Sequence, residues 1–425
     1  MNPVHRAIEV EGAMSKYEHS EPETVRTNAM RFSRRSLLKA GLALPSLGWT
    51  FPALRISSRN DSSFDPWIEV HSENLRHNVG EVSKRVNGRP ILAVIKNNGY
   101  GLGVQNVAHV LEPLDPIAGF AVVKLHEALS LREDGVQKPI LLLGPFDERD
   151  LEEMVAQRIT PMVYTPLGKT LDAMSDKFQK PISIQICVDT GIGRVGVPHA
   201  EAAELIRDLA GRKSVRIDGI MMTFTEDHEF DQEQLRRFQS LCKGLAETGI
   251  KLGMRHAASS FGLFQRPDGF LDMVRPGMVL FGIYPEKEFR DMGLMQLRPG
   301  VSLKTRVIYV KQLHTGDSAG YDRQFKAQGD TWVATLPVGH ADGYPRVATK
   351  GARVQIGGNL YPVVALSASH SVVEVGPESK VAIGDVATLF DWQDGSRPED
   401  IASSCGASVY DLTMHLNPLL PRRVL

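Results

Sequence analysis

A lysine followed closely by a tyrosine and two glycines is the part of the sequence best suited to chemistry. Lys96 comes directly after the apolar run Ile91–Ile95, and Tyr100, Gly101 and Gly103 follow it. A lysine buried among apolar side chains has a lowered pKa, and its neutral amine can attack an aldehyde to form a Schiff base. Glycines let the backbone approach a ligand closely, and a tyrosine hydroxyl near a helix start suits a phosphate. Taken alone, a lysine that ends a strand is more often a solvated tip, so the surrounding elements must decide.

Residues 66–295 alternate short apolar runs with segments whose apolar residues recur at helical spacing. Examples of the runs are Gly119–Val123, Ile140–Leu143 and Ile182–Val188, and one helical segment begins at His126. Apolar strands that are each followed by an amphipathic helix indicate a parallel sheet buried on both faces. More than five such repeats favour a closed (β/α)8 TIM-type barrel over an open doubly wound sheet. A lysine ending the first strand would then point into the mouth where such barrels hold their active sites.

Residues 296–425 differ in character from the chain before them. Segments such as 301–313, 331–339 and 352–366 alternate apolar and polar residues, and Gly, Asp and Asn turns separate them. A period of two is typical of β-strands that bury one face. We therefore expect an α/β fold in which the barrel, residues 66–295, is followed by a C-terminal β-rich domain.

Residues 1–60 are interpreted as a targeting signal and linker. Adjacent arginines in RFSRRSLLK, at 31–39, precede a modest apolar stretch at 40–54, which matches a twin-arginine export signal. The alternative is a basic patch before an amphipathic helix. The stretch is too short to span a membrane, and no apolar run of about 18 residues occurs elsewhere. We expect an exported, periplasmic protein whose mature form has no membrane segment.

Charge and cysteine content exclude several classes of function. The chain has 49 basic and 50 acidic residues and a net charge of -1, which argues against a nucleic-acid-binding protein. Its three cysteines, Cys187, Cys242 and Cys405, lie far apart with no CxxC spacing. The sequence therefore predicts neither a disulfide framework nor a zinc site.

Six motifs, in order, resemble those of the alanine racemase family of fold-type III pyridoxal-phosphate enzymes. They are Lys96–Gly103, VDTGIGRVG at 188–196, HAASS at 256–260, VRPGMVLFG at 274–282, Gly320–Tyr321 and GHADGYPR at 339–346. The resemblance covers nearly all of residues 66–425. One such motif would be a weak sign, whereas six in order on a barrel followed by a β domain are a strong one. The resemblance implies an isomerase that interconverts L- and D-amino acids with pyridoxal phosphate as its cofactor.

The resemblance also implies a two-base mechanism. Lys96 and Tyr321 would exchange protons on opposite faces of a planar carbanion, for which the cofactor, held on Lys96 as a Schiff base, is the electron sink. Tyr321 would come from the β domain of a second subunit, which implies a homodimer. Arg275 would face the pyridine nitrogen and leave it unprotonated, since a guanidinium does not give up its proton. Arg194 would lie on the side of the substrate carboxylate and bind that group. The phosphate would be held by Tyr100, Ser260 and the backbone of Gly277 and Met278.

Three departures from the family pattern lie in the barrel. Thr223 stands where the family has a histidine that stacks on the cofactor and contacts the catalytic tyrosine. Cys187 replaces a lysine, and Ser259 replaces an asparagine. Loss of the histidine would remove a partner that tunes Tyr321.

Three further departures lie in the C-terminal domain. His340 replaces a tyrosine near the substrate, and Val424 is the expected match of a second tyrosine that contacts the phosphate. Ser367–His370 replaces the Cys-Met-Asp-Gln segment of the substrate entrance. Smaller side chains there predict a wider and more neutral pocket, and hence a slower or broader-specificity racemase.

Two other readings are possible. The first is a decarboxylase or aldolase on the same architecture, although Arg275 argues against decarboxylation, because those enzymes prefer an acidic partner at the pyridine nitrogen. The second is a homologue that binds the cofactor or another ligand without catalysis, which the departures favour. Visible absorbance of the purified protein and its loss on borohydride reduction would separate these readings.

Overall fold

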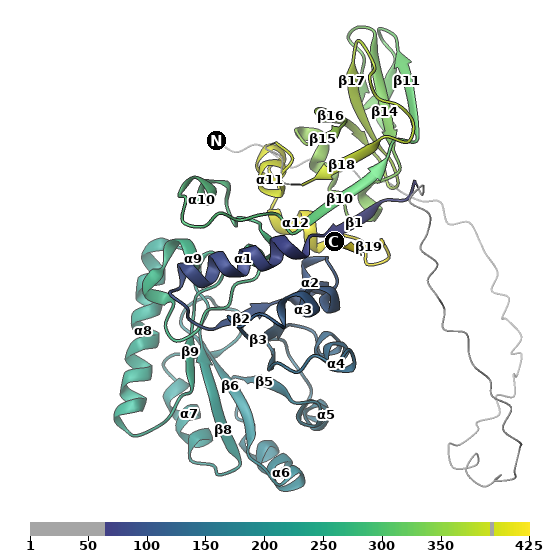
Figure 1. Cartoon of the computed structure of the whole chain (residues 1–425). Coiled ribbons are helices and arrows are strands. Elements are labelled where there is room, and N and C mark those ends of the chain that lie inside the picture. The colour runs from purple at the N-terminus through teal and green to yellow at the C-terminus, as the bar shows by residue number, and fades with distance from the viewer. Residues whose placement is uncertain (1–63, 392–394) are drawn as a thin grey trace, which may run out of the picture. The chain divides into compact units, whose positions relative to one another are not determined.

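The computed structural model describes residues 64–391 and 395–425, which form two regions built on separate sheets (Figure 1). The twin-arginine segment predicted at 31–54 lies outside the described residues. Within these residues no helix is both long enough and apolar enough to cross a bilayer.

The first region is a parallel barrel whose strands follow one another in chain order. Its strands are β2 (Ile91–Val94), β3 (Ile117–Val122), β4 (Ile140–Leu142), β5 (Ile159–Val163), β6 (Ile182–Asp189), β8 (Val215–Met221) and β9 (Met254–His256). Two parallel bridges close the ring: His256 pairs with Met273, and Val274 pairs with Ile91. The Leu92 N–H donates to the Val274 carbonyl at 2.9 Å. The prediction of a closed barrel is therefore confirmed, with a last strand of only two bridged residues.

Helices cover the outside of the barrel because each has one apolar face, and the strands are apolar on both faces (Figure 1). The helices are α1 (Ser72–Arg85), α3 (Val104–Leu111), α4 (Leu125–Glu133), α5 (Leu151–Ala156), α6 (Gly168–Phe178), α7 (Ala202–Ala210) and α8 (His228–Glu247). The longest of these, α8, is capped by Asp227, whose carboxylate accepts the Phe230 N–H at 2.8 Å. This N-cap satisfies one of the donors that a helix start leaves free.

The second region is the β-rich domain that the sequence predicts after the barrel. Its main sheet has the order β11-β14-β17-β16-β15-β18-β10-β1-β19. The strands are β10 (Val301–Arg306), β11 (Tyr309–Leu313), β14 (Thr331–Leu336), β15 (Arg353–Ile356), β16 (Asn359–Leu366), β17 (Ser371–Gly376), β18 (Val386–Phe390) and β19 (Arg422–Val424). The remaining strand, β1 (Trp67–Val70), precedes the barrel in the chain and pairs with β10 and β19.

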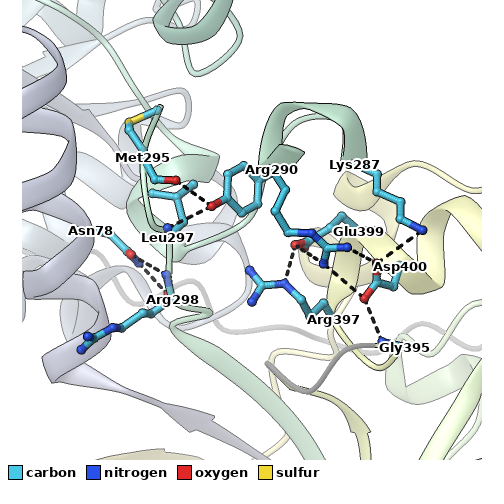
Figure 2. A network of polar contacts seen from close by, with 11 residues as sticks. Asn78, Lys287, Arg290, Met295, Leu297, Arg298, Gly395, Arg397, Glu399 and Asp400 are labelled. Atoms are coloured by element: carbon cyan, nitrogen blue, oxygen red, sulfur yellow. Dashed lines mark hydrogen bonds and ion pairs between the residues drawn. The ribbon is translucent and has the colours of Figure 1, made fainter. Parts of the chain in front are cut away.

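A buried network of ion pairs joins the segment after the barrel to the C-terminal helices (Figure 2). Arg290, in α10 (Lys287–Asp291), lies 3.3 Å from Asp400 and 3.9 Å from Glu399. Both carboxylates belong to α11 (Pro398–Cys405), and Glu399 is only 1% exposed. Arg397 Nε donates to Glu399 at 2.6 Å. Ion pairs thus join α10 to α11, which are far apart in the sequence.

Candidate active site

A cavity of about 410 Å³ opens at the carboxyl ends of the barrel strands, where barrels of this type hold their active sites. Six side chains or glycines that the sequence singles out line it together: Lys96, Tyr100, Arg194, Ser260, Arg275 and Gly277. They come from four different strand ends, so the barrel fold itself brings them into one place.

A second cavity, of about 430 Å³, opens at the amino ends of β5, β6 and β8. Its lining is basic, but its arginine side chains already form hydrogen bonds within the protein. The Arg132 guanidinium donates to the carbonyls of Gln157 and Arg158, both at 2.9 Å. Arg216 donates to Asp218 at 2.7 Å. These contacts hold loops together, so chemistry is assigned to the carboxyl end.

The chain turns left-handed directly after Lys96. Residues 97–101 all have φ between 53° and 90°, which is a rare run for L-amino acids. Of the residues expected at the start of the next helix, Gly103 directly precedes α3, which begins at Val104, whereas Tyr100 lies in the turn before it. One helical turn separates Lys96 from Tyr100, so both side chains lie on the same side and line the cavity.

Lys96 has the environment that its proposed chemistry requires. Its pKa is lowered, first by burial of the amine and second by the positive charge of Arg194. The carboxylate of Glu127 acts in the opposite direction. The side chain is half-buried at the cavity wall, so it can reach a ligand and still be partly shielded from water. A larger fraction of neutral, nucleophilic amine follows.

Arg275 is a buried cation whose guanidinium is held in place by hydrogen bonds to backbone carbonyls and to His256. It is 5% exposed, and its guanidinium donates to the Met222 carbonyl at 2.7 Å and to the His256 carbonyl at 2.8 Å. Nη1 also donates to His256 Nδ1 at 2.9 Å. Burial lowers the pKa of Arg275 to about 10, which still leaves the group charged at neutral pH. Only its remaining surface can face a ligand, because backbone carbonyls fix its orientation.

His256 supports Arg275 from behind. Because Nδ1 accepts from Arg275, the ring proton lies on Nε2, which is 2.8 Å from the amide oxygen of Gln185. Complete burial and the adjacent Arg275 lower the pKa of His256 well below its usual value. The histidine is therefore a neutral relay between Gln185 and Arg275.

Ser260, Gly277 and Tyr100 form a compact cradle. Ser260 Oγ accepts the Gly277 N–H at 3.0 Å and the Val279 N–H at 3.4 Å. A Cβ added to Gly277 would lie 2.2 Å from the Tyr100 hydroxyl oxygen, so only glycine fits there. The Tyr100 ring also packs 4.8 Å from Phe281. Backbone N–H groups and two hydroxyls thus converge on one wall of the cavity, which suits an anion.

Two predicted site residues lie elsewhere in the chain. The Met278 side chain is buried and does not line the cavity, although its backbone follows Gly277. Tyr321 is 78% exposed, at the start of a short 3-10 turn in the C-terminal region. A single chain therefore does not place Tyr321 in the cavity with Lys96.

The three barrel departures all border the cavity. Thr223, Cys187 and Ser259 line it. Arg275 Nη2 lies 3.4 Å from Thr223 Oγ, which is a weak contact. Burial raises the pKa of Cys187 to about 11, so this residue is a thiol where the family has a cation.

Two of the three departures in the C-terminal domain, His340 and the segment 367–370, lie side by side outside the single-chain cavity. The His340 N–H donates to the Ser367 carbonyl at 3.1 Å, and the Ala341 N–H donates to the Ala368 carbonyl at 2.9 Å. The two altered segments are therefore neighbours, and any effect on substrate entry is a joint one. Val424 lies in β19 and is half-exposed, so it contributes nothing to the cavity.

Two residues that the sequence reasoning missed also line the cavity. Tyr410, in α12 (Val409–Met414), lies 6.4 Å from Tyr100 between ring centroids. Glu226 brings a carboxylate to the barrel side of the cavity, apart from the entrance segment 367–370 for which the sequence predicts a more neutral lining. The signal for Tyr410 was its place in SVYDLTMHL, a short helical stretch with one aromatic residue. Glu226 sits in a loop with no recognisable motif.

Metal ligands are not gathered anywhere in the described ranges. No group of three or more His, Cys, Asp or Glu side chains there could hold an ion. Cys187, Cys242 and Cys405 are separate, buried thiols.

Comparison with known families gives two matches in chain order. The family model described as alanine racemase, N-terminal domain, matches residues 70–285. The model described as alanine racemase, C-terminal domain, matches residues 300–424.

Individual relatives agree with these matches. The alanine racemase of Clostridium kluyveri is 31% identical over 366 residues, covering 84% of this chain and 93% of the relative. That of Desulforamulus reducens is 32% identical over 84% of this chain and 98% of the relative. The solved alanine racemase of Clostridium difficile has a TM-score of 0.78 at 27% identity, covering 85% of this chain and 96% of that one. The Streptomyces lavendulae structure has a TM-score of 0.79 at 26% identity, covering 86% and 98%. With both domains matched in order and the motifs of the cavity in place, this chain belongs to the alanine racemase family.

Proposed function

We propose that this chain is a pyridoxal-phosphate-dependent racemase that interconverts L- and D-alanine, or a broader set of small amino acids. The observation that carries the proposal is Lys96, a lysine with a lowered pKa on the wall of a cavity at the barrel mouth. Arg275, which lines the same cavity as a buried cation, supports a racemase over a decarboxylase.

The residues present fit the cofactor. The cradle of Ser260, Gly277 and Tyr100 suits a phosphate, because it gathers two hydroxyls at the cavity wall, and the lack of a side chain at Gly277 lets the Tyr100 hydroxyl lie against the backbone. Lys96 is placed to hold the aldehyde carbon, and Arg275 to face the ring nitrogen. When bound, pyridoxal phosphate supplies an electron sink for the charge left at the substrate Cα.

The chain's own groups then handle binding and protons. Lys96 Nζ takes a proton from one face of the substrate Cα or returns one to it, for which a neutral amine is required at the start. Arg194 offers a guanidinium to the substrate carboxylate. Arg275 holds a fixed positive charge, because backbone carbonyls and His256 keep its donors engaged.

We also propose that a second copy of the chain completes the site. Tyr321 is 78% exposed and outside the cavity, so the hydroxyl for the opposite face has to come from a partner. In a homodimer with two equivalent sites, each site takes Lys96 from one subunit and Tyr321 from the other. A mixed dimer of Lys96→Ala and Tyr321→Phe therefore has one site with both residues intact. Mixing the two inactive variants and refolding them together should restore about a quarter of wild-type activity. Mixtures that stay inactive, from subunits shown to exchange, would contradict a shared site.

The main experiment combines colour with chirality. Wild-type protein should absorb in the visible range and lose that absorbance on borohydride reduction, and it should racemise Ala. Lys96→Ala should be colourless and inactive, whereas Lys251→Ala, at an exposed lysine, should match wild type. Colour without Cα hydrogen exchange would favour another reaction, and a colourless protein would favour a binding role.

Substrate range is the second part of the proposal. Thr223 and Cys187 replace larger family side chains at the cavity wall, which favours broad specificity. Initial rates on Ala, Ser, Lys and Arg should differ less than in a dedicated alanine enzyme. Turnover confined to Ala would overturn this part alone.

Export by the twin-arginine route is proposed from residues 31–54. That route carries folded proteins, which suits an enzyme that acquires its cofactor before export. Replacing Arg34 and Arg35 by lysine should retain the protein in the cytoplasm, as measured by fractionation. Unchanged periplasmic yield would refute the proposal.

A further inference from the structure

Glu127 is a buried carboxylate close to the chemistry but outside the lining of the cavity. It is 5% exposed and lies in the first turn of α4. Oε1 accepts the Asn98 N–H at 2.7 Å, and Oε2 accepts the Lys124 N–H at 3.3 Å. Both carboxylate oxygens therefore accept a hydrogen bond from a backbone N–H group.

No cation is paired directly with this carboxylate. The ion pairs found in the described part of the chain do not include Glu127. A buried charge without a partner is costly, so its presence needs a compensating interaction. Two backbone N–H groups supply part of that compensation, and the nearby Lys96 amine is the cation on which Glu127 acts.

The same carboxylate holds the unusual turn after Lys96. Each L-residue in the left-handed region costs roughly 1 kcal/mol or more, and Tyr100 has no small side chain to reduce that cost. The turn is fixed at its second residue: Asn98 donates its N–H to Glu127, and its side-chain oxygen accepts the Val104 N–H at 3.2 Å. Glu127 thus contacts the backbone two residues after Lys96.

We propose that Glu127 is a positioning residue for Lys96, which anchors the left-handed turn through Asn98 and brings a negative charge to the side of the Lys96 amine. The catalytic consequence rests on the proposed function, but the charge relation is a property of the chain alone.

The electrostatics agree with this geometry. Burial and Arg194 lower the pKa of Lys96, and Glu127 raises it. The other titratable groups that line the cavity are Tyr100, Cys187, Arg194, Glu226, Arg275 and Tyr410. Two carboxylates lie near the cavity, Glu127 and Glu226. Only Glu127 raises the pKa of Lys96, whereas Glu226 lies near Ser259 and Tyr410.

A group that alternates between base and acid has to be stable in both forms. Burial and Arg194 both favour the neutral form of Lys96, and Glu127 favours the protonated form. Glu127 offsets part of this effect while remaining outside the space that a ligand occupies.

The test uses the cofactor-free full chain, labelled by reductive ¹³C-methylation of its lysines. The Lys96 resonance is assigned by its absence in Lys96→Ala and is followed by NMR as a function of pH. Glu127→Gln keeps an oxygen that can accept the Asn98 N–H but removes the charge. We expect its Lys96 resonance to titrate at lower pH than in wild type. Glu133→Gln, on the exposed part of the same helix, is the matched control and should leave the titration unchanged.

The outcomes separate the charge from the hydrogen bond. An unchanged Lys96 titration in folded Glu127→Gln overturns the proposal. Glu127→Asp keeps the charge, so it should restore the titration even if its thermal midpoint is lower, and it serves if Glu127→Gln does not fold. In an active protein, the pH profile of kcat should shift in the same direction. Failure of the racemase assay with a shifted titration would reject the proposed function and retain the role of Glu127.

Discussion

Glycine at position 277 is required by what lies opposite it. A Cβ there would meet the Tyr100 hydroxyl oxygen at 2.2 Å, and the backbone N–H already donates to Ser260. Gly277→Ala should therefore displace Tyr100 and open the cradle. We expect at least tenfold weaker binding of pyridoxal phosphate by absorbance titration, since a loss of about 1.4 kcal/mol gives a factor of ten.

The control for this variant is Gly244→Ala. Gly244 lies within α8, and an added Cβ would meet nothing within 4 Å. An alanine there should stabilise the helix by roughly 0.5–1 kcal/mol and leave cofactor binding unchanged. Equal cofactor affinity in Gly277→Ala and wild type would contradict the cradle.

His256 predicts a pH dependence of stability. Its folded-state pKa lies well below the usual 6.5, so below about pH 6.5 the unfolded chain binds a proton that the folded chain does not. Stability is therefore lost as pH falls, by about 1 kcal/mol between pH 6.5 and 5.5 for one such group. His256→Gln should flatten this part of the profile in urea unfolding.

An exposed histidine provides the comparison. His109→Gln removes a side chain that is 56% exposed and should keep the wild-type slope. If His256→Gln and His109→Gln show the same slope as wild type, burial of His256 does not contribute to the pH dependence.

At the scale of elements, the short closing strand of the barrel depends on its neighbours. Asp272 precedes Met273 and accepts from Arg255 Nε at 2.8 Å and Arg255 Nη2 at 2.9 Å. Arg255 lies in β9, so this bidentate pair aligns the closing segment with the strand before it. Asp272→Asn should destabilise the protein by about 1 kcal/mol in urea unfolding, a value limited by partial exposure of both side chains.

The matched variant is Glu247→Gln in the exposed Lys243–Glu247 pair, whose atoms are 4.0 Å apart. Its effect should be near zero, because exposed pairs contribute little. A similar loss in both variants would show that the closing strand does not depend on Asp272.

Long apolar strands and amphipathic helices were predictable because each carries its own pattern. Ile91–Val94 and Ile182–Asp189 are buried along most of their length, as their apolar residues indicate. The left-handed turn was not predicted, since Asn-Asn-Gly is compatible with several turns and its anchor, Glu127, lies 29 residues away. The closing strand was missed because two bridged residues give no periodicity.

The residues of the site were predictable only where a local sequence motif indicated their role. Lys96, Arg275 and Ser260 stand in recognisable motifs, and the structure brings them to one cavity. Gln185 and His256 are joined across 71 positions, and no local pattern records that contact. Tyr410 reaches the cavity from a different region of the chain, so only the folded structure reveals it.

At the scale of the whole molecule, the ion pairs of Figure 2 join α10 to α11, and Arg397 adds a local pair to one of the same carboxylates. Glu399 is paired with Arg397 at 2.6 Å, and both are buried. Glu399→Leu leaves Arg397 as a buried charge without this partner and should cost roughly 3–5 kcal/mol in thermal or urea unfolding.

The double variant Arg397→Met with Glu399→Leu should recover most of that loss, because an apolar pair of similar volume removes both charges. Cofactor absorbance should be close to wild type in the double variant, since neither residue lines the cavity. A double variant as unstable as Glu399→Leu would show that the pair itself, and not the uncompensated charge, is essential.

The position of β1 has a consequence for biosynthesis. Trp67–Val70 lies between β10 and β19, and the adjacent Ser72–Leu425 hydrogen bond spans 353 residues. At about 5–20 residues per second, a ribosome needs roughly 20–70 seconds to make that length of chain. The barrel can assemble in this interval, while β1 lacks β10 for most of it and lacks β19 until its end. Completion of the second sheet is therefore a late step in the maturation of the nascent chain.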